Sequence, residues 1–219
     1  MAIILCLETA TTNCSVAVAI DGEVKAIREE NNQKFSHAEK LHVFIEEVLN
    51  EANIDNKKLD AVAVSKGPGS YTGLRIGVSA AKGLCFALDI PLISIPTLEV
   101  LAHQVNTPNS HIVPLLDARR MEVYSAVFNS DKKQVQKTKA EILNEDSFAD
   151  FLEKGKIIFI GDGAVKFESI CKHKNAVFQN DLFPSSVGMV QLAEDKYKKS
   201  DFENVAYFEP FYLKEFMMG

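Results

Sequence analysis

The sequence predicts an α/β fold with two stacked lobes, and three observations lead to this fold class. The chain has 219 residues, which is enough for one large domain or for two small ones with separate cores. Its composition, 47% apolar and 25% charged, is typical of a soluble globular protein. Three strand-like segments followed by alternating helices and strands occur twice along the chain. We therefore expect one α/β lobe at 1–105 and another at 106–219, divided in the polar stretch 106–110.

The first half begins with three short strands that can pair antiparallel. The apolar run Ile3–Glu8 and the alternating run 15–20 predict two strands, and an Asp-Gly turn leads into a third at Glu23–Glu30. A helix is expected from Ser36, because Ser36 and Glu39 fit a capping box. The remaining elements are expected as strands at 59–65 and 91–95, a helix to about 88 after a Gly-rich turn, and a short helix from 97.

The second half repeats this order without a visible repeat of residues. Strands are expected at 112–116, 122–128, 134–140 and 157–160, and helices at 144–154, 164–172 and 187–198. The run 134–140 is highly polar, which makes it the weakest strand prediction of the second lobe. The duplicated order resembles the architecture of the actin, sugar kinase and Hsp70 superfamily (ASKHA).

The charge of the chain argues against tight RNA binding by the chain alone. The net charge is −6, and the basic residues do not gather into one dominant block. Because nucleic-acid affinity depends chiefly on cationic contacts to phosphates, a partner should supply most of any RNA binding.

The cysteines and the hydropathy predict a cytoplasmic location. The four cysteines lack Cys-x-x-Cys spacing and lie in apolar stretches, so we expect reduced core residues. The longest apolar runs are too short to span a membrane, and residues 1–5 lack the pattern of a signal peptide.

The most informative segment is Gly-Pro-Gly-Ser-Tyr-Thr-Gly-Leu-Arg-Ile-Gly at 67–77. A Gly-rich turn between a strand and a helix can bind an anion through backbone N–H groups. The segment lacks the Gly-Lys-Ser/Thr ending of a Walker A loop, and Gly67, Gly69 and Gly73 are spaced one residue too widely for the dinucleotide motif. The alternative is a tight turn that these glycines serve for packing alone.

Three segments together resemble the TsaB family. They are the 67–77 turn, Leu-Glu-Thr at 7–9 and the run 116–124, and the ending at 210–214 is similar too. The resemblance covers nearly the whole chain and implies a cytosolic subunit without its own catalytic site. The implied partners are the paralogue TsaD, the ATPase TsaE and the threonylcarbamoyl-AMP synthase. Together they would form threonylcarbamoyladenosine (t6A) beside the anticodon of tRNA, which this chain would contact only through the complex.

The same resemblance bears on cofactors. In the superfamily, the first hairpin places acidic and hydroxyl groups around nucleotide phosphate, and here Glu8, Thr9, Thr11 and Asn13 occupy that region. The structural alternative is a strand end with a polar turn. We expect no cofactor on this chain alone, with ATP or ADP confined to the assembled complex. Asp117 and Arg119 form a similar turn in the second lobe, where we prefer a bidentate or turn-closing pair to a catalytic dyad.

A metal site and a catalytic residue are not expected. TsaD carries a His-x-x-x-His metal pair, and our alignment puts Thr97 and Leu101 at those places, neither of which replaces an imidazole ligand. Two rival functions are a superfamily ATPase or phosphotransferase and a metal-dependent glycoprotease-like protein. The first hairpin is a poor match to a phosphate-binding turn, which argues against an ATPase or phosphotransferase. The missing histidine pair argues against a metal-dependent glycoprotease.

The helix after the Gly-rich turn is apolar nearly all round, which predicts burial on more than one side. It carries a stripe of small residues that would let a second helix approach closely. We expect this stripe, with the helix at 36–52, to meet TsaD or a second copy of the chain as a four-helix interface. The sequence does not decide whether the protein alone is a monomer or a homodimer. The predicted interface residues are Leu41, Ile45, Gly73, Gly77, Ala80, Ala81 and Leu84. The alternative is that the stripe packs only within its own chain.

Overall fold

Two five-stranded sheets organise the chain in the computed structural model, which describes residues 1–31 and 37–214. In the first sheet the strand order is β3-β2-β1-β4-β5. The first three strands pair antiparallel, and β4 and β5 continue the sheet in parallel with β1. The strands are β1 (Ile3–Glu8), β2 (Cys14–Ile20), β3 (Glu23–Glu30), β4 (Ala61–Gly67) and β5 (Leu92–Pro96).

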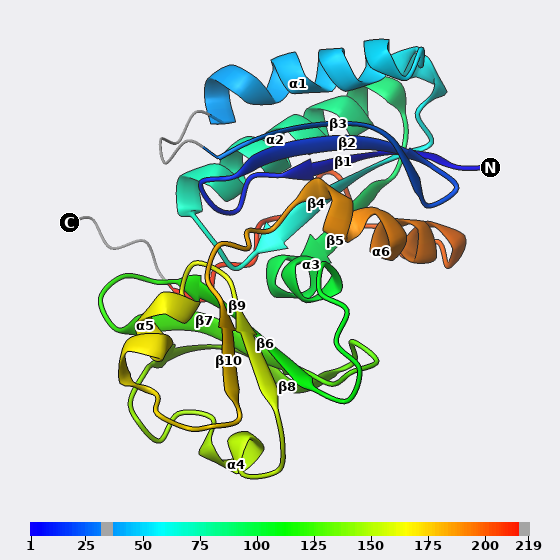
Figure 1. The fold of residues 1–219 in the computed structure, drawn as a ribbon. Coiled ribbons are helices and arrows are strands. Elements are labelled where there is room, and N and C mark those ends of the chain that lie inside the picture. The colour runs from blue at the N-terminus through cyan, green and yellow to red at the C-terminus, as the bar shows by residue number, and fades with distance from the viewer. Residues whose placement is uncertain (32–36, 215–219) are drawn as a thin grey trace. The chain divides into compact units, whose positions relative to one another are not determined.

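Helices cover both faces of the first sheet (Figure 1). On one face lie α1 (His37–Glu51) and α2 (Tyr71–Leu88), and on the other lies α6 (Ser186–Lys198). Successive side chains of β1 enter opposite cores: Leu5 and Leu7 pack with α1 and α2, and Ile4 and Cys6 pack with α6. Burial on both faces explains why β1 and β4 are continuous apolar runs in the sequence.

The second sheet has the same topology as the first. Its order, β10-β9-β6-β7-β8, again contains three antiparallel strands followed by two parallel ones. This confirms the duplicated α/β architecture that the order of apolar patterns predicts, including the polar strand at 134–140. The strands are β6 (His111–Asp117), β7 (Glu122–Phe128), β8 (Gln134–Ile142), β9 (Ile157–Ile160) and β10 (Ala176–Gln179).

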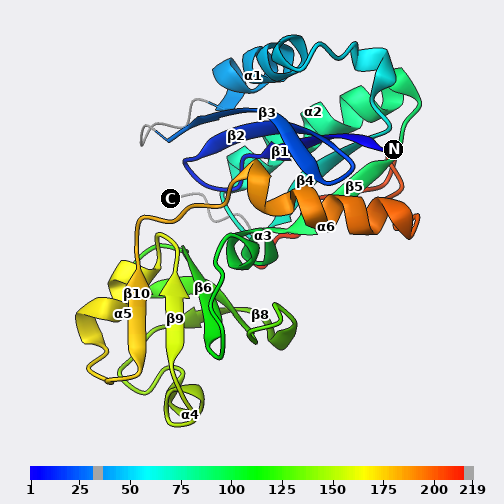
Figure 2. The same ribbon diagram turned by 45° about the vertical axis from the view of Figure 1, so that its right-hand side comes forward.

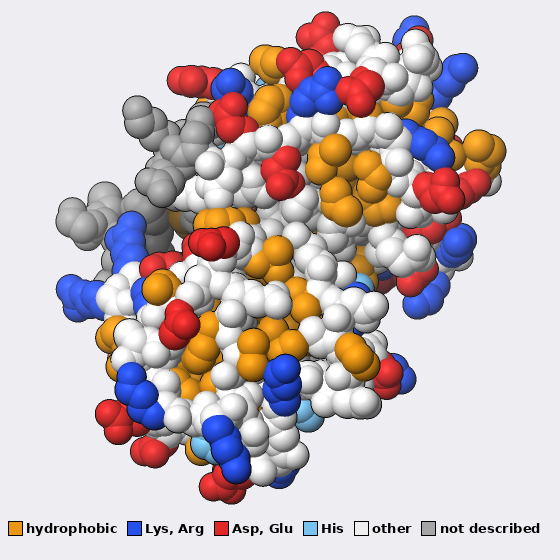
Figure 3. Space-filling view, viewed as in Figure 1, with side chains coloured by type: hydrophobic (Ala, Val, Ile, Leu, Met, Phe, Trp, Pro, Cys, Tyr) orange, Lys and Arg blue, Asp and Glu red, His pale blue; other side chains and the backbone are white. Residues whose placement is uncertain are grey.

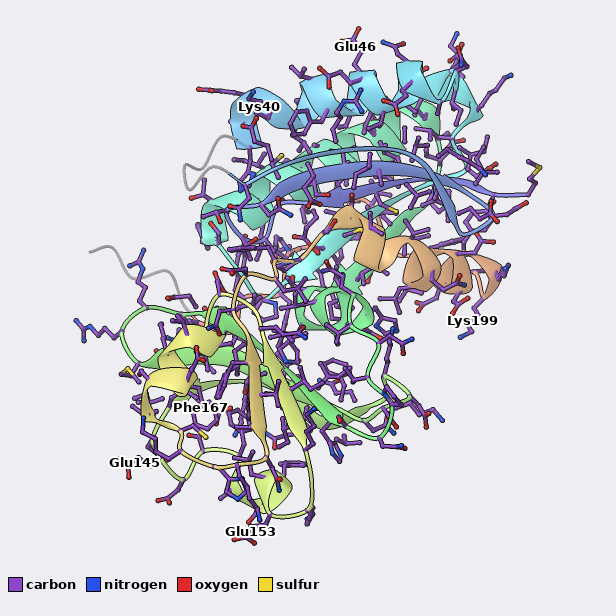
Figure 4. All side chains as sticks on the ribbon, in the orientation of Figure 1. Lys40, Glu46, Glu145, Glu153, Phe167 and Lys199 are labelled. Atoms are coloured by element: carbon purple, nitrogen blue, oxygen red, sulfur yellow. The ribbon has the colours of Figure 1, made fainter. Side chains whose placement is uncertain are left out.

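Aromatic side chains form much of the core beside the second sheet. Phe159 of β9 lies 4.8 Å between ring centroids from Phe167 of α5 (Ala164–Ile170), and both rings meet Phe148 edge-on. In Figure 4, Phe167 lies on α5, whereas Glu46 points outward from α1. Edge-to-face packing of this kind stabilises a core beyond the area it buries.

The chain crosses between two compact units, and this corrects the predicted domains. The first unit comprises residues 1–100 and 184–212, and the second comprises 101–183 and 213–219. The predicted lobe 106–219 is therefore wrong at residues 184–212, because α6 packs on the first sheet and Phe211 N donates to Lys66 O at 2.7 Å. The division falls inside α3 (Thr97–His103), a few residues before the predicted boundary.

One predicted helix is shorter in the structure, one predicted cap lies outside the described residues, and two short elements were not predicted. The helix expected at 144–154 is reduced to α4 (Ala149–Leu152), because the Asn144 side chain accepts the Asp146 N–H in a turn and Phe148 has φ 62°. The short edge strand β10 was not predicted, since its four residues lack a distinct pattern. The predicted N-cap Ser36 lies outside the described residues. A 3₁₀ turn (Asn56–Lys58), not predicted, precedes β4.

Charged side chains of both signs are interspersed over the face shown in Figure 3. Within the residues that the structure describes, no helix is both long enough and apolar enough to span a bilayer.

Candidate functional site

The loop after β1 and the Gly-rich turn after β4 lie at the same edge of the first sheet. Because β1 and β4 are parallel neighbours, their carboxyl ends meet there, which brings Glu8 beside Ser65. Ligand sites of open α/β sheets form at this edge, so it is the first place to test the predicted nucleotide-binding residues.

The Glu8 carboxyl group is fully buried and bonded within the chain. It accepts hydrogen bonds from the Ser65 hydroxyl and, at 2.7 Å, from the Ala10 N–H. Burial raises the pKa of Glu8 to about 7, against the lowering effect of these hydrogen bonds. Glu8 therefore holds the loop by hydrogen bonding rather than presenting a free carboxylate at the surface.

The other three predicted nucleotide-binding residues are also buried. The Thr9 hydroxyl donates to Gly73 O at 2.8 Å, and the Asn13 amide donates to Pro184 O at 2.9 Å. The Thr11 hydroxyl accepts the Asn13 N–H at 3.3 Å. Nucleotide binding by these residues stays a prediction, but in this conformation their side chains face the protein interior.

Three glycines allow the Gly-rich turn and the start of α2 to pack tightly against the β1–β2 loop. A Cβ atom added to Gly69, Gly73 or Gly77 would lie less than 3.0 Å from Ala10 or Thr9, so these glycines let the start of α2 press on the β1–β2 loop. Positive φ is needed elsewhere, at Gly67, where φ is 115° and the chain passes close to the Phe211 carbonyl. The packing alternative for the 67–77 turn is thus the one that the contacts favour.

The start of α2 uses its own polar groups in the same way. Ser70 caps the helix by accepting the Gly73 N–H on its hydroxyl at 3.2 Å, and the Ser70 N–H donates to Ala10 O at 2.7 Å. These donors, which could otherwise bind an anion, are already bonded within the chain.

The residues aligned with the metal pair of TsaD lie inside the protein. Thr97 and Leu101, both on α3, are buried. Over residues 1–31 and 37–214, no three histidine, cysteine or carboxylate side chains converge as a metal site would require.

The predicted interface stripe is largely buried within the first unit, and its role in pairing stays a prediction. Leu41 and Ala81 have no exposed surface, and Ala80 joins them in the core between α1, α2 and the sheet, with Ile45 also buried. Gly73 and Gly77 press on Thr9, and Leu84 is half-buried. Most of the stripe thus packs within its own chain, as the stated alternative has it, while Ala80 and Leu84 also line a pocket between α1 and α2.

A different face of α2 is exposed. Its residues are spaced by three, four, four and three: Thr72, Arg75, Ser79, Gly83 and Phe86. Phe86 is 86% exposed, which is unusual for a large apolar side chain. Between α1 and α2, which lie side by side in Figures 1 and 2, a pocket of about 350 Å³ is lined by His42, Ile76, Ser79, Ala80, Gly83 and Leu84.

In the second unit, Asp117 and Arg119 form the turn-closing pair that the sequence predicts. The Arg119 N–H donates to the Asp117 carboxylate at 2.6 Å, so the contact is made by the backbone of Arg119. The carboxylate also lies 2.9 Å from the Lys166 ammonium group.

Comparison with known proteins decides the family. Residues 29–210 match the family model described as TsaD: tRNA N6-adenosine threonylcarbamoyltransferase. The chain is 32% identical over 195 residues to the tRNA threonylcarbamoyladenosine biosynthesis protein TsaB of Buchnera aphidicola subsp. Schizaphis graminum, covering 83% of this chain and 91% of the relative. The chain belongs to the TsaB family.

A second relative and one solved structure agree with this family, and another solved structure shares the fold. TsaB of Escherichia coli is 28% identical, over 96% of this chain and 94% of its own. A Pseudomonas aeruginosa protein, described as similar to the peptidase YeaZ, has a TM-score of 0.84 at 25% identity, over 98% of this chain and 100% of its own. A dehydratase activator from Clostridium difficile, solved with ADPNP, has a TM-score of 0.51 at 10% identity, over 92% of this chain and 98% of its own, which shows the ASKHA fold alone.

For this TsaB-family chain, sequence reasoning missed Ser65 and the exposed face of α2. Ser65 has no local signal, because its role depends on β4 lying beside β1. The exposed face did have one: small and polar residues recur along an otherwise apolar helix at 72, 75, 79 and 83.

Proposed function

We propose that the chain is a non-catalytic subunit in the biosynthesis of tRNA threonylcarbamoyladenosine and that it supports a TsaD-related partner. The proposal rests on membership of the TsaB family and on the match of residues 29–210 to the threonylcarbamoyltransferase family model. The partner would perform the transfer to the adenosine next to the anticodon.

The observation that supports a non-catalytic role is that the protein's own residues occupy the space beside the β1–β2 loop, at the edge of the first sheet. The start of α2 packs against Thr9 of the β1–β2 loop, and Glu8, Thr9, Thr11 and Asn13 are all buried within the protein. A phosphate at this loop would have to displace α2. We therefore place ATP or ADP, and the action of a TsaE-like ATPase, in the assembled complex.

The partner surface that we propose is the exposed face of α1 and α2. It combines the pocket between the two helices with exposed Val43 and Phe86. Gly83 lies at its centre with no atom within 4 Å of an added Cβ, so a neighbouring helix could approach closely there. In the absence of the partner, a second copy of the chain could use the same face.

The remaining parts of the proposal concern RNA and location. With a net charge of −6, the chain would contribute little to tRNA affinity by itself, so the partner would hold most of the tRNA. The four cysteines are unpaired and buried, which suits the reducing cytoplasm.

Gly83→Arg tests the proposed surface. The new side chain enters open space, so the fold is retained, while a long cation at the centre of the face blocks close helix packing. We expect pairing with a TsaD from the same source to weaken at least tenfold in a pull-down titration. Threonylcarbamoylation of tRNA by the reconstituted system should fall in parallel.

Gly155→Arg is the matched control, because Gly155 in the second unit also has open space around an added Cβ. It should pair and support modification as the wild type does. A Gly83→Arg protein that pairs normally would move the interface elsewhere. A system that modifies tRNA at full rate without this chain would contradict the proposed function itself.

A further inference from the structure

A turn in the second unit carries two arginines that the proposed pairing does not use. It joins β6 to β7 (Figure 1), and the Glu122 N–H donates to Arg119 O at 3.1 Å across it. Both Arg119, with φ 73°, and Arg120, with φ 51°, have left-handed backbone conformations. Glycine adopts these angles without strain, and a long side chain rarely does. Two cations at such positions point to a role for the side chains.

The acidic groups of this turn are already neutralised by lysines. The Asp117 carboxylate pairs with Lys166 at 2.9 Å and also accepts the Arg119 N–H, while Glu122 pairs with Lys214. Lys166 in addition donates to Glu122 O at 3.0 Å, which ties the two sides of the turn together. The turn is therefore held rigidly by groups other than the guanidinium groups.

The two guanidinium groups remain available to a ligand. Arg119 and Arg120 are both exposed, and neither has a carboxylate partner among residues 1–31 and 37–214. Elsewhere in the chain, Arg28 shows the contrasting case, since Glu47 and Glu51 both bind its guanidinium group. The β6–β7 turn thus presents two unpaired cations from a fixed backbone.

We propose that Arg119 and Arg120 contact the phosphate backbone of an RNA bound to the assembled complex. The inference rests on the proposed function, which supplies the RNA. Guanidinium donors match phosphate oxygens in a bidentate arrangement, and contacts to a polyanion gain from the release of counterions. Such contacts position an RNA without reading its sequence. They also reconcile an acidic chain with a task on tRNA, because the cations are needed only at one turn.

The test replaces both arginines by glycine in the complex with the TsaD-related partner. Arg119→Gly with Arg120→Gly removes two charges and suits the backbone of the turn, so misfolding does not confuse the result. We expect the affinity of the complex for tRNA to fall about tenfold, and the slope of log K against log salt to lose about 1–2 in magnitude. Arg119→Lys with Arg120→Lys should keep most of the slope, since it keeps both charges.

Lys57→Ala with Lys58→Ala is the charge-matched control, because these two exposed lysines are also adjacent and lie in the first unit. Unchanged tRNA affinity and slope in the arginine variant would overturn the inference, and so would an equal loss in the lysine control. Loss of partner pairing with normal tRNA binding would show that the arginines contact protein instead. Failure of the wild-type chain to form the complex would overturn the proposed function, which makes the two failures distinguishable.

Discussion

Glu8 shows how one buried residue ties the candidate site to the stability of the fold. Glu8 is the last residue of β1 and has no exposed surface. Its carboxyl group accepts hydrogen bonds from Ser65 on the neighbouring strand and from the Ala10 backbone. Removing a carboxylate from water disfavours its charged form, so the group takes up a proton more readily in the folded chain than in the unfolded one.

The first prediction concerns the pH dependence of stability. Burial raises the pKa of Glu8 from 4.5 to about 7, so between these pH values the folded chain keeps a proton that the unfolded chain releases. The stabilisation is therefore present at low pH and is lost as pH rises through about 7. The amide of Glu8→Gln does not titrate in this pH range, so the variant lacks this pH dependence. Relative to wild type, its free energy of unfolding should rise by roughly 2–3 kcal/mol between pH 5 and pH 8.

Urea denaturation of both proteins at several pH values measures this difference, and all other titrating groups cancel in it. Parallel pH profiles for the wild type and Glu8→Gln would show that the Glu8 proton is not coupled to folding.

At the scale of elements, α2 is the helix whose packing decides what the Gly-rich turn does. Its N-terminal half presses on the β1–β2 loop through Gly73 and Gly77, and its opposite side carries the exposed Gly83 and Phe86. One helix thus contains glycines of two kinds, one required by contact within the chain and one surrounded by open space.

The same substitution at two positions of α2 tests this distinction. Gly73→Ala puts a methyl group less than 3.0 Å from the Thr9 carbonyl, so we expect a loss of about 1–3 kcal/mol in the free energy of unfolding. Gly83→Ala meets no atom within 4 Å and removes a flexible residue from a helix, so it should gain about 0.5–1 kcal/mol. Thermal and urea unfolding of the pair give the result. Equal effects of the two substitutions would mean that the close packing of α2 on Thr9 is not real.

For the whole molecule, the main feature is that the chain leaves the first unit and returns to it. Residues 184–212 complete the first unit by placing α6 on its sheet and by pairing Glu203 with Leu92. The Asn13 amide and the Ser15 hydroxyl also bond to this returning segment, at Pro184 and Ser186. The stability of the first sheet therefore depends on residues far away in the sequence.

Met189→Ala on α6 tests that dependence. Met189 is fully buried against the first sheet, so the substitution should cost about 2–5 kcal/mol and lower hydrogen-exchange protection in β1, β4 and β5. Val187→Ala on the same helix is the control, because Val187 is 45% exposed and should change stability by no more than about 0.5 kcal/mol. Protection lost from β6 and β9 instead would place α6 with the second unit, as the sequence had predicted.

Local patterns were sufficient for most of the fold. Strands buried on both faces, such as β1 and β4, are continuous apolar runs, and α1 shows a one-sided apolar stripe, so their types follow from neighbouring residues. The repeated order of these elements was enough to predict the duplicated topology. The length of helix α4 was overestimated, because Asn144 and Asp146 form a turn over residues that were expected to be helical.

The candidate site needed the tertiary structure. From the sequence alone, the 67–77 turn could serve an anion or packing, and in an α2 that is apolar nearly all round only the small and polar residues at 72, 75, 79 and 83 indicate which face is free. The structure decided both points. Only the position of the β1–β2 loop shows that the Thr9 carbonyl lies so close to Gly73 that a side chain there would clash with it. The placement of α6 was decided in the same way. Periodicity is a property of neighbouring residues, whereas the choice of the surface that buries each apolar face depends on contacts between segments far apart in the chain.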